Sequence, residues 1–287
     1  MQRELSILIP TRDYVCYKLV ADLHEQAERL GVSFEILVAE DGSRSSFTVI
    51  ANHKITELPH CRHIIRRENA GRAAIRNFLM QEAEGDFLLF MDADGQIVRD
   101  DFLGKYIQAA RQGHKVICGG VLHPQQWHDP RSMLRWKYEN AYEQKHGTVS
   151  QQFRSFSFMI SRDVARCVHF DERYTGYGYE DVQFGLDLQR AGYAVCSIDN
   201  PLLNSDIEDN ATFLRKTEEA MRSLHRFREE IGENVKIFRI YSRYRLFSPL
   251  LRFSFRLFGP LMRRNLLSAN PSLTLFNLYK LGYFSAI

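Results

Sequence analysis

The sequence predicts an α/β fold: a doubly wound, mostly parallel sheet with helices on both faces, followed by a helical C-terminal appendage. Between residues 4 and 120, short apolar runs alternate with longer amphipathic stretches. This β-α-β-α order is typical of a parallel sheet covered by helices. The alternation weakens after residue 121, and the chain becomes basic and aromatic near its end. We therefore expect a main domain at 1–232 and a basic, aromatic helical segment at 233–287.

The individual elements are predicted from the spacing of apolar residues and from the glycines and prolines that interrupt them. Strands are expected at residues 5–10, 34–39, 61–67, 87–91, 115–121 and 153–163, and helices at 14–30, 70–83, 99–112, 129–144, 180–192 and 212–228. The first helix would place four apolar residues on one face: Leu19, Leu23, Ala27 and Leu30. Gly192 would close the helix at 180–192.

Composition narrows the class of protein. With 45% hydrophobic and 25% charged residues, the chain resembles an ordinary globular protein, and its net charge of +3 is too small to indicate nucleic-acid binding. Its five cysteines are scattered and never spaced C-x-x-C, which argues against a disulfide framework or a zinc site. The first apolar run is too short for a signal peptide or a membrane span. We expect a reducing, cytoplasmic location.

Polar clusters follow three predicted strands: "PTRD" at 10–13, "EDGS" at 40–43 and "DADG" at 92–95. Ligands of such sheets bind beyond the carboxyl ends of the strands, so these clusters should share one edge. Asp92 and Asp94 would repel each other unless a cation lay between them. Their oxygens suit Mg²⁺ or Mn²⁺, which take further ligands from water and phosphate.

Taken alone, "DADG" also allows other interpretations. A capped turn uses the same residue types without any function. A calcium loop fails because Ile97 occupies the position that needs glycine, and the bidentate acidic ligand is missing. A dehalogenase-type phosphatase also uses D-x-D-G, but that motif usually ends the first strand, and Gln96 stands where Thr or Val is expected.

A second group of polar residues opens the helix before the "DADG" strand. It comprises Asn69, Gly71, Arg72, Arg76 and Asn77. Helix N-termini and arginines bind anions, and the spacing of the two arginines places them on one face. A solvated basic face is the alternative.

A third group is the glycine-aromatic turn at 176–179, which leads into Glu180 and Asp181. Acidic residues at a helix start are favoured by the helix dipole, so a simple cap is one interpretation. Glycines also let a substrate approach the backbone closely. Aromatic side chains beside carboxylates suit the C–H faces of sugar rings.

Together these segments resemble the family 2 glycosyltransferases, which have the GT-A nucleotide-sugar fold. The resemblance spans residues 4 to 228 and rests on five motifs in order: "SILIPTRD", "ILVAEDGS", "ENAGRAAIRN", "GDFLLFMDADG" and "GYGYEDVQFGLDLQRAG". Each motif alone is weak evidence. Five in the right order and at familiar separations are strong.

For the donor, the resemblance implies a site at the three strand ends and the helix start. Pro10, Thr11 and Asp41 would hold the base, for which uracil is expected, with Glu40 beside them. The two arginines of the helix start would line the diphosphate. The full set of nucleotide-sugar-binding candidates is Pro10, Thr11, Arg12, Asp13, Glu40, Asp41, Asn69, Gly71, Arg72, Arg76, Asp92 and Ala93.

For metal and catalysis, the resemblance implies that Asp92 faces the ribose and the metal shell while Asp94 binds Mn²⁺ or Mg²⁺. Asp181 would be the catalytic base, and Glu180 would hold the acceptor hydroxyls. The chemistry agrees, because an inverting transfer needs a carboxylate to take the acceptor proton and a metal to stabilise the departing diphosphate.

The chain departs from the family at three positions. Asp13 replaces a usual Asn and Glu40 a usual Asp, and both changes look tolerable. Many relatives carry a histidine that completes the metal shell, where this chain has Asn204. Asn204 is a weak oxygen ligand, and Asp206 lies two residues on, so either could complete the shell or metal affinity could be reduced.

The tail is basic. No acidic residue follows Glu233, whereas nine basic ones do: Lys236, Arg239, Arg243, Arg245, Arg252, Arg256, Arg263, Arg264 and Lys280. Four of these arginines, at 245, 252, 256 and 263, have the spacing of one helical face, and Pro249 and Pro260 would break the tail into short helices. The segment is typical of a helix lying on an anionic membrane surface, or of a subdomain packed on the main domain.

The sequence thus predicts an inverting, metal-dependent transferase that moves a sugar from a UDP-sugar to a hydroxyl of a glycan or lipid-linked glycan in polysaccharide biosynthesis. It would lie in the cytoplasm, peripherally on the inner face of the cell membrane. One alternative is a degenerate scaffold protein at a membrane, which the Asn204 departure favours. Another is a sugar-phosphate nucleotidyltransferase, although the G-x-G-T-R loop of that class is missing.

Overall fold

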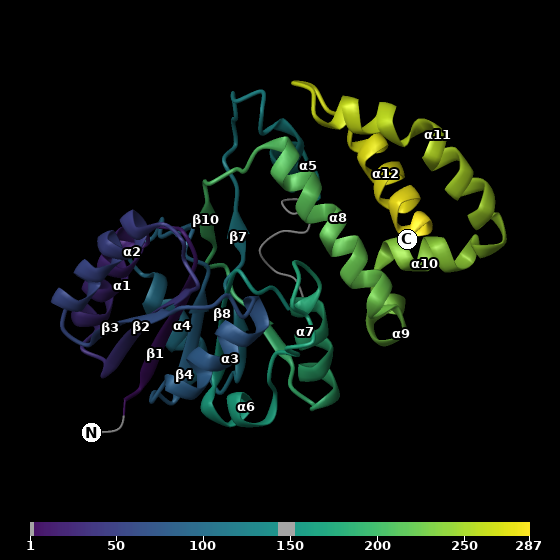
Figure 1. The fold of residues 1–287 in the computed structure, drawn as a ribbon. Coiled ribbons are helices and arrows are strands. Elements are labelled where there is room, and N and C mark those ends of the chain that lie inside the picture. The colour runs from purple at the N-terminus through teal and green to yellow at the C-terminus, as the bar shows by residue number, and fades with distance from the viewer. Residues whose placement is uncertain (1–2, 143–152) are drawn as a thin grey trace. The chain divides into compact units, whose positions relative to one another are not determined.

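The computed structural model describes residues 3–142 and 153–287, which form two compact units (Figure 1). Within the described residues, the first unit comprises 3–122, 153–175 and 180–205, and the second comprises 123–142, 176–179 and 206–287. The second unit is therefore larger than the appendage expected at 233–287.

The first unit is built on a seven-stranded sheet with the order β3-β2-β1-β4-β8-β6-β9. The strands are β1 (Leu5–Thr11), β2 (Phe34–Asp41), β3 (Cys61–Arg66), β4 (Phe87–Met91), β6 (Val116–Cys118), β8 (Ser157–Ser161) and β9 (Val195–Ser197). β1 runs parallel to both β2 and β4, and only β8 is antiparallel to its neighbours. The mostly parallel sheet predicted from the sequence is confirmed, and β1, β2 and β4 end at one edge.

The strand expected at 115–121 is wrong as a single element. It divides into β6 and β7 (Val121–Leu122), which belong to different sheets. Gly119 and Gly120 separate them: a Cβ on Gly119 would lie 2.2 Å from the Tyr106 hydroxyl, and Gly120 has a φ of 87°. β7 joins β10 (Leu202–Asn204) and β5 (Gly95–Gln96) in a small second sheet with the order β5-β10-β7.

Each face of the large sheet is covered by helices. On one face, α1 (Tyr17–Leu30) and α4 (Phe102–Arg111) pack on alternate residues of the central strands. On the other, α3 (Arg72–Glu82), α6 (Arg162–Cys167) and α7 (Glu180–Arg190) pack on the intervening ones. A short helix, α2 (Ser46–His53), follows β2.

The buried face of α1 differs from the expectation at one end. Leu19, Leu23 and Ala27 are buried as predicted, but Leu30 is 44% exposed. The helix ends there, at Gly31 with its left-handed φ of 63°. The last turn therefore has no sheet beneath it.

The second unit is helical, with α5 (Met133–Tyr142), α8 (Asn210–Arg226), α9 (Arg228–Ile231), α10 (Lys236–Arg243), α11 (Ser248–Leu266) and α12 (Leu273–Ala286). Its core contains one or two residues from each of the four main helices: Leu134, Leu214, Leu266, Phe276 and Tyr279. The helix expected at 129–144 begins later than predicted, and residues 143 and 144 lie outside the described residues.

Pro249 lies in the first turn of α11, as expected, but Pro260 does not end the helix. An internal proline costs about 3 kcal/mol because it lacks an N–H and clashes with the preceding turn. Phe255 packs edge-to-face on Tyr279 before Pro260, and Leu266 joins the same core after it. Contacts with α12 on both sides of Pro260 thus hold α11 together. No helix in 3–142 or 153–287 is long and apolar enough to span a membrane.

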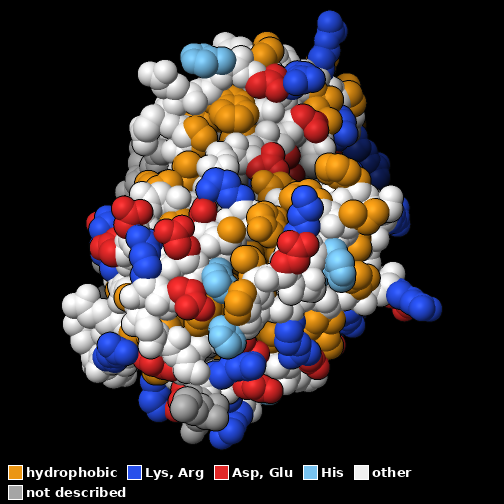
Figure 2. All heavy atoms as spheres, turned by 90° about the vertical axis from the view of Figure 1, so that its left-hand side faces the viewer, with side chains coloured by type: hydrophobic (Ala, Val, Ile, Leu, Met, Phe, Trp, Pro, Cys, Tyr) orange, Lys and Arg blue, Asp and Glu red, His pale blue; other side chains and the backbone are white. Residues whose placement is uncertain are grey.

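Figure 2 shows the side of the molecule that lies at the left of Figure 1, where α1, α2 and β3 are found. Acidic and basic side chains are interspersed with apolar ones over this face. No single sign of charge dominates it, in keeping with the small net charge of the sequence.

Candidate active site

Two arginines and two carboxylates form one network in the first unit. At the start of α3, Arg72 Nη2 lies 2.7 Å from Asp92 Oδ2, and Arg76 Nη2 lies 2.9 Å from Asp92 Oδ1. The same arginines approach Glu180 Oε1 at 3.2 Å (Arg72 Nε) and 3.4 Å (Arg76 Nη1). The sequence predicted two separate acidic sites, at the end of β4 and at the start of α7. The structure joins Asp92 and Glu180 through shared arginines.

The two arginines differ in exposure. The Arg76 side chain is only 1% exposed and lies over the Phe170 ring at 5.3 Å, whereas the Arg72 side chain is 40% exposed. Buried charges need partners. Arg76 is therefore fixed in the interior by Asp92 and Glu180, while Arg72 remains accessible to an incoming anion.

Glu180 and Asp181 open α7. Burial raises the pKa of Asp181 to about 6, and the charge of Glu180 adds to this rise. A carboxyl group with such a pKa is a stronger base than an ordinary aspartate and is still ionised at neutral pH. The residue before the pair, Tyr179, has a left-handed φ of 71°, an unusual conformation that often occurs at functional sites.

One carboxylate oxygen of Glu180 has no hydrogen-bond partner among the described residues. Its Oε2 is buried and accepts no hydrogen bond from any residue in the described part of the chain. Buried polar atoms almost always have a partner, so this oxygen fits a donor that the protein itself does not supply. A hydroxyl group is one such donor.

Asp94 follows β4 and directly precedes β5, a strand of the small sheet. In the small sheet, Asn204 pairs with Gly95 in the antiparallel ladder of β10 and β5. The Asn204 side chain is buried, and its Oδ1 has no hydrogen-bond partner within 3–142 and 153–287.

A divalent cation needs several oxygen ligands, for which Asp92, Asp94 and Asn204 are the candidates. The described residues contain no group of three His, Cys, Asp or Glu side chains that could hold a metal. Asp94 and the unsatisfied Asn204 oxygen supply two oxygen donors, and Asp92 lies two residues away, although arginines engage both its oxygens. Such a donor set fits Mg²⁺ or Mn²⁺, which complete their shells with water and substrate phosphates.

Asp41 holds the start of α3. Its two oxygens accept hydrogen bonds from the backbone N–H groups of Ala70 (2.9 Å) and Gly71 (3.0 Å). The loop after β2 packs closely against the loop before α3, since a Cβ on Gly42 would lie 2.4 Å from the backbone nitrogen of Asn69. Asp41 thus positions the helix that carries both arginines.

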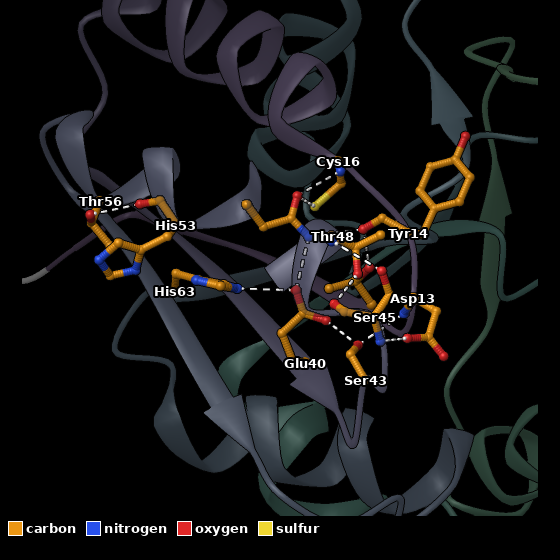
Figure 3. Close-up of polar contacts among 12 residues, drawn as sticks. Asp13, Tyr14, Cys16, Glu40, Ser43, Ser45, Thr48, His53, Thr56 and His63 are labelled. Atoms are coloured by element: carbon orange, nitrogen blue, oxygen red, sulfur yellow. Dashed lines mark hydrogen bonds and ion pairs between the residues drawn. The ribbon is translucent and has the colours of Figure 1, made fainter. Parts of the chain in front are cut away.

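Glu40 is fully buried beneath this edge, in a cluster that the sequence did not reveal (Figure 3). It accepts hydrogen bonds from Asn52 Nδ2 at 2.9 Å and from Ser43, and His63 Nε2 lies at 3.1 Å. Burial alone would raise the pKa of Glu40, but these hydrogen bonds hold it below the ordinary value. His63 lies near Glu40 because of the register in which β2 and β3 pair, so no local sequence motif could identify this contact.

Asp13, two residues beyond the end of β1, supports the same loop. Its carboxylate accepts hydrogen bonds from the N–H groups of Arg44 (2.7 Å) and Ser45 (2.8 Å), and its own N–H donates to Ser43 Oγ (2.9 Å). The bond from Ser45 is the main reason that the pKa of Asp13 is lowered. Asp13 has a left-handed φ of 51°, which Asp and Asn tolerate better than most residues.

The remaining donor-site candidates lie at the same sheet edge or at the start of α3. Thr11 is buried at the end of β1, where it pairs in register with Glu40, and Pro10 precedes it. Arg12 and Asn69 are exposed, and Ala93 packs partly against the core. The predicted residues are therefore gathered around one end of β1, β2 and β4.

A sheet in this order, with an Asp-x-Asp turn after β4 and an acidic pair opening α7, defines a GT-A-type fold. The glycosyl transferase family 2 profile matches residues 6–168, more than half of the chain. The chain therefore belongs to glycosyl transferase family 2, as its motifs suggested.

Individual relatives agree with this assignment. An uncharacterized glycosyltransferase of Haemophilus influenzae is 27% identical over 119 residues, which cover 40% of this chain and 46% of the relative. The chain thus matches just under half the length of that protein.

Among solved structures, similarity extends to the mannosyltransferase PcManGT of Pyrobaculum calidifontis in complex with GDP-Man and Mn²⁺ (TM-score 0.57, 15% identity, 77% of this chain and 63% of that one). It also extends to glucosyl-3-phosphoglycerate synthase of Mycobacterium tuberculosis with Mn²⁺, UDP and glucosyl-3-phosphoglycerate (TM-score 0.51, 16% identity, 78% and 80%). At these identities the likeness concerns the fold.

Proposed function

We propose that this protein is an inverting glycosyltransferase that moves a sugar from a nucleoside-diphosphate sugar, with a UDP-sugar as the first candidate, to a hydroxyl of a glycan or lipid-linked glycan in polysaccharide biosynthesis. The observation that carries the proposal is the network in which Arg72 and Arg76 join Asp92 to Glu180. Two cationic groups beside the first acidic residue of α7 support a diphosphate site close to the catalytic pair.

In the transfer, Asp181 accepts the proton of the acceptor hydroxyl as the oxygen attacks the anomeric carbon of the donor. The bond from that carbon to the diphosphate breaks, and its electron pair leaves with the phosphate oxygen. Attack opposite to the leaving group inverts the anomeric configuration. The pKa of Asp181, about 6, suits a base that must be ionised at neutral pH and still bind a proton in the transition state.

Glu180 would orient the acceptor. Its unsatisfied Oε2 can accept a hydrogen bond from a second acceptor hydroxyl, while its Oε1 stays with the arginines. Fixing the acceptor oxygen near Asp181 lowers the entropic cost of the reaction.

The arginines would stabilise the leaving diphosphate. Arg72, partly exposed, can exchange Asp92 for phosphate oxygens, because guanidinium groups bind carboxylate and phosphate in the same bidentate way. Asp94 and Asn204, with Asp92, would hold Mn²⁺ or Mg²⁺. When bound, the cation would neutralise charge on the diphosphate.

Calorimetry with UDP, GDP and ADP, with and without Mn²⁺, tests the proposal on the wild type. The solved structures named above contain different nucleotides, so both uridine and guanosine forms belong in the panel. Positive samples are then incubated with the matching nucleotide sugars, and release of the diphosphate is measured. Mn²⁺-dependent binding and turnover of one donor class are expected. If no nucleotide binds under any condition, the proposal fails in favour of a non-catalytic scaffold.

A further inference from the structure

The second unit exposes a row of large apolar side chains on α11 and on the short turn of helix before it. The row contains Leu246, Phe247, Leu250, Phe253, Leu257 and Leu261, of which each is 59% exposed or more. Leu246 and Phe247 lie in the helical turn Arg245–Phe247. The four on α11, Leu250, Phe253, Leu257 and Leu261, are three or four residues apart, which places them along one side of the helix. From Leu250 to Leu261 this apolar row is about 17 Å long.

The opposite side of α11 is occupied by the protein. Phe255 packs on Tyr279 and Tyr283, Leu266 is in the core, and Arg263 contacts Glu218. The apolar row therefore is not the face that holds the helix in the second unit. A soluble protein rarely exposes such a continuous apolar surface without a function for it.

Free positive charge accompanies the row. Five arginines on α10, on α11 and between them are exposed and make no ion pair or side-chain hydrogen bond with any residue in 3–142 or 153–287: Arg239, Arg243, Arg245, Arg256 and Arg264. No acidic residue occurs after Glu233 to neutralise them. Of the arginines expected on one basic face, Arg252 and Arg263 instead bind the protein, through the Ser285 carbonyl and through Glu218.

From the apolar row and these arginines, we infer that α11 docks the protein on an anionic lipid bilayer, with the apolar row inserted at the level of the headgroups. Apolar side chains and unpaired arginines together are what such an interface requires. A second copy of the chain is a poorer occupant, because a two-fold interface through this surface would bring like-charged arginines together.

The test is co-sedimentation of the full-length chain with vesicles of phosphatidylcholine alone and of phosphatidylcholine with 30% phosphatidylglycerol. The variant Phe253→Ser/Leu257→Ser/Leu261→Ser removes half of the apolar row at exposed positions. The matched control is Phe47→Ser/Ile50→Ser, which removes apolar side chains that are 74% and 69% exposed on α2. Circular dichroism confirms that each variant is folded.

We expect the wild type and the control to bind anionic vesicles at least tenfold better than neutral ones, and 0.5 M salt to weaken this binding. The triple variant should bind at least tenfold less. Equal binding by the triple variant, or no binding by the wild type, overturns the inference. So does a wild-type dimer in light scattering that the triple variant loses while vesicles bind neither protein. Nucleotide binding is measured separately and does not depend on this result.

Discussion

Arg76 and Asp92 are joined by a hydrogen bond of 2.9 Å between Nη2 and Oδ1, although they come from the first turns of α3 and from the end of β4. The Arg76 side chain is almost completely buried and also reaches Glu180. One buried cation thus fixes the distance between the two acidic segments of the site.

Replacing Arg76 with Met should destabilise the protein by about 3 kcal/mol, because it leaves Asp92 and Glu180 short of a buried partner. Arg72→Met should cost less than about 1 kcal/mol, since that side chain is partly exposed and its pairs are screened. Urea unfolding measures both. Arg111→Met, which removes an exposed pair with Glu4, is the control and should change little. Equal losses in the two site variants would contradict the difference in burial.

Both arginine variants should also weaken nucleoside-diphosphate binding at least tenfold in calorimetry. Arg72→Met loses the accessible phosphate-binding group, and Arg76→Met loses the buried cation that positions Asp92 and Glu180. The Arg111→Met control should bind like the wild type. If Arg72→Met binds normally although folded, the diphosphate lies elsewhere.

Donor turnover should depend on the ionisation of Asp181. With a pKa of about 6 and a base that acts as the carboxylate, turnover should be low at pH 5, rise tenfold per pH unit below the pKa, and level off above about pH 7. Initial rates of diphosphate release at pH 5 to 8 measure this. A flat profile would exclude Asp181 as the base.

Asp181→Asn should abolish turnover and leave nucleotide binding nearly unchanged. Asp187→Asn, in the same helix with an exposed pair to Arg190, is the matched control and should keep its turnover. Loss of nucleotide binding in Asp181→Asn would place this residue in the donor site.

The metal role of Asp94 is tested by Asp94→Ala, which should remove the Mn²⁺ dependence of nucleotide binding. Asp100→Ala removes an exposed carboxylate from the same loop region and should retain that dependence. Calorimetry with and without Mn²⁺ distinguishes them. Mn²⁺-dependent binding that survives in Asp94→Ala would assign the cation to other ligands.

Asn204→Asp should strengthen metal binding, because it converts a buried neutral oxygen donor, on the strand that pairs with Gly95, into a charged one. Without metal the new buried charge should lower the melting temperature, and Mn²⁺ should raise it more than in the wild type. Gln108→Glu, which adds a charge at an exposed position of α4, controls for net charge and should show no such difference. No change in the response to Mn²⁺ would separate Asn204 from the metal.

We expect Glu40 to contribute to the free energy of unfolding of the protein. Glu40→Gln should cost roughly 2 kcal/mol at pH 7, because hydrogen bonds to a buried carboxylate are replaced by weaker neutral ones. The pKa of Glu40 is lowered in the folded state, so its contribution is present at neutral pH and is lost as pH falls below its ordinary value of 4.5. Urea unfolding of both proteins at pH 7 and pH 4 should show the difference shrinking. An equal difference at both pH values would contradict this account.

The sequence by itself determined what is local or periodic. The apolar runs located β1, β2, β3 and β4 closely, and short polar motifs after them marked the carboxyl edge where parallel strands meet. These features depend on spacing along the chain, which a reader of the sequence can see.

Tertiary structure alone decided what depends on register and packing. It joined Asp92 to Glu180 through buried arginines, brought His63 to Glu40 across two strands, and divided the predicted strand at Gly119. It also kept α11 helical through Pro260 and placed a row of apolar side chains at the surface, whereas the sequence indicated a basic, aromatic segment without showing which side chains would be exposed. In each case the deciding contacts join residues far apart in the chain, and their energies outweigh the local preferences on which sequence patterns rest.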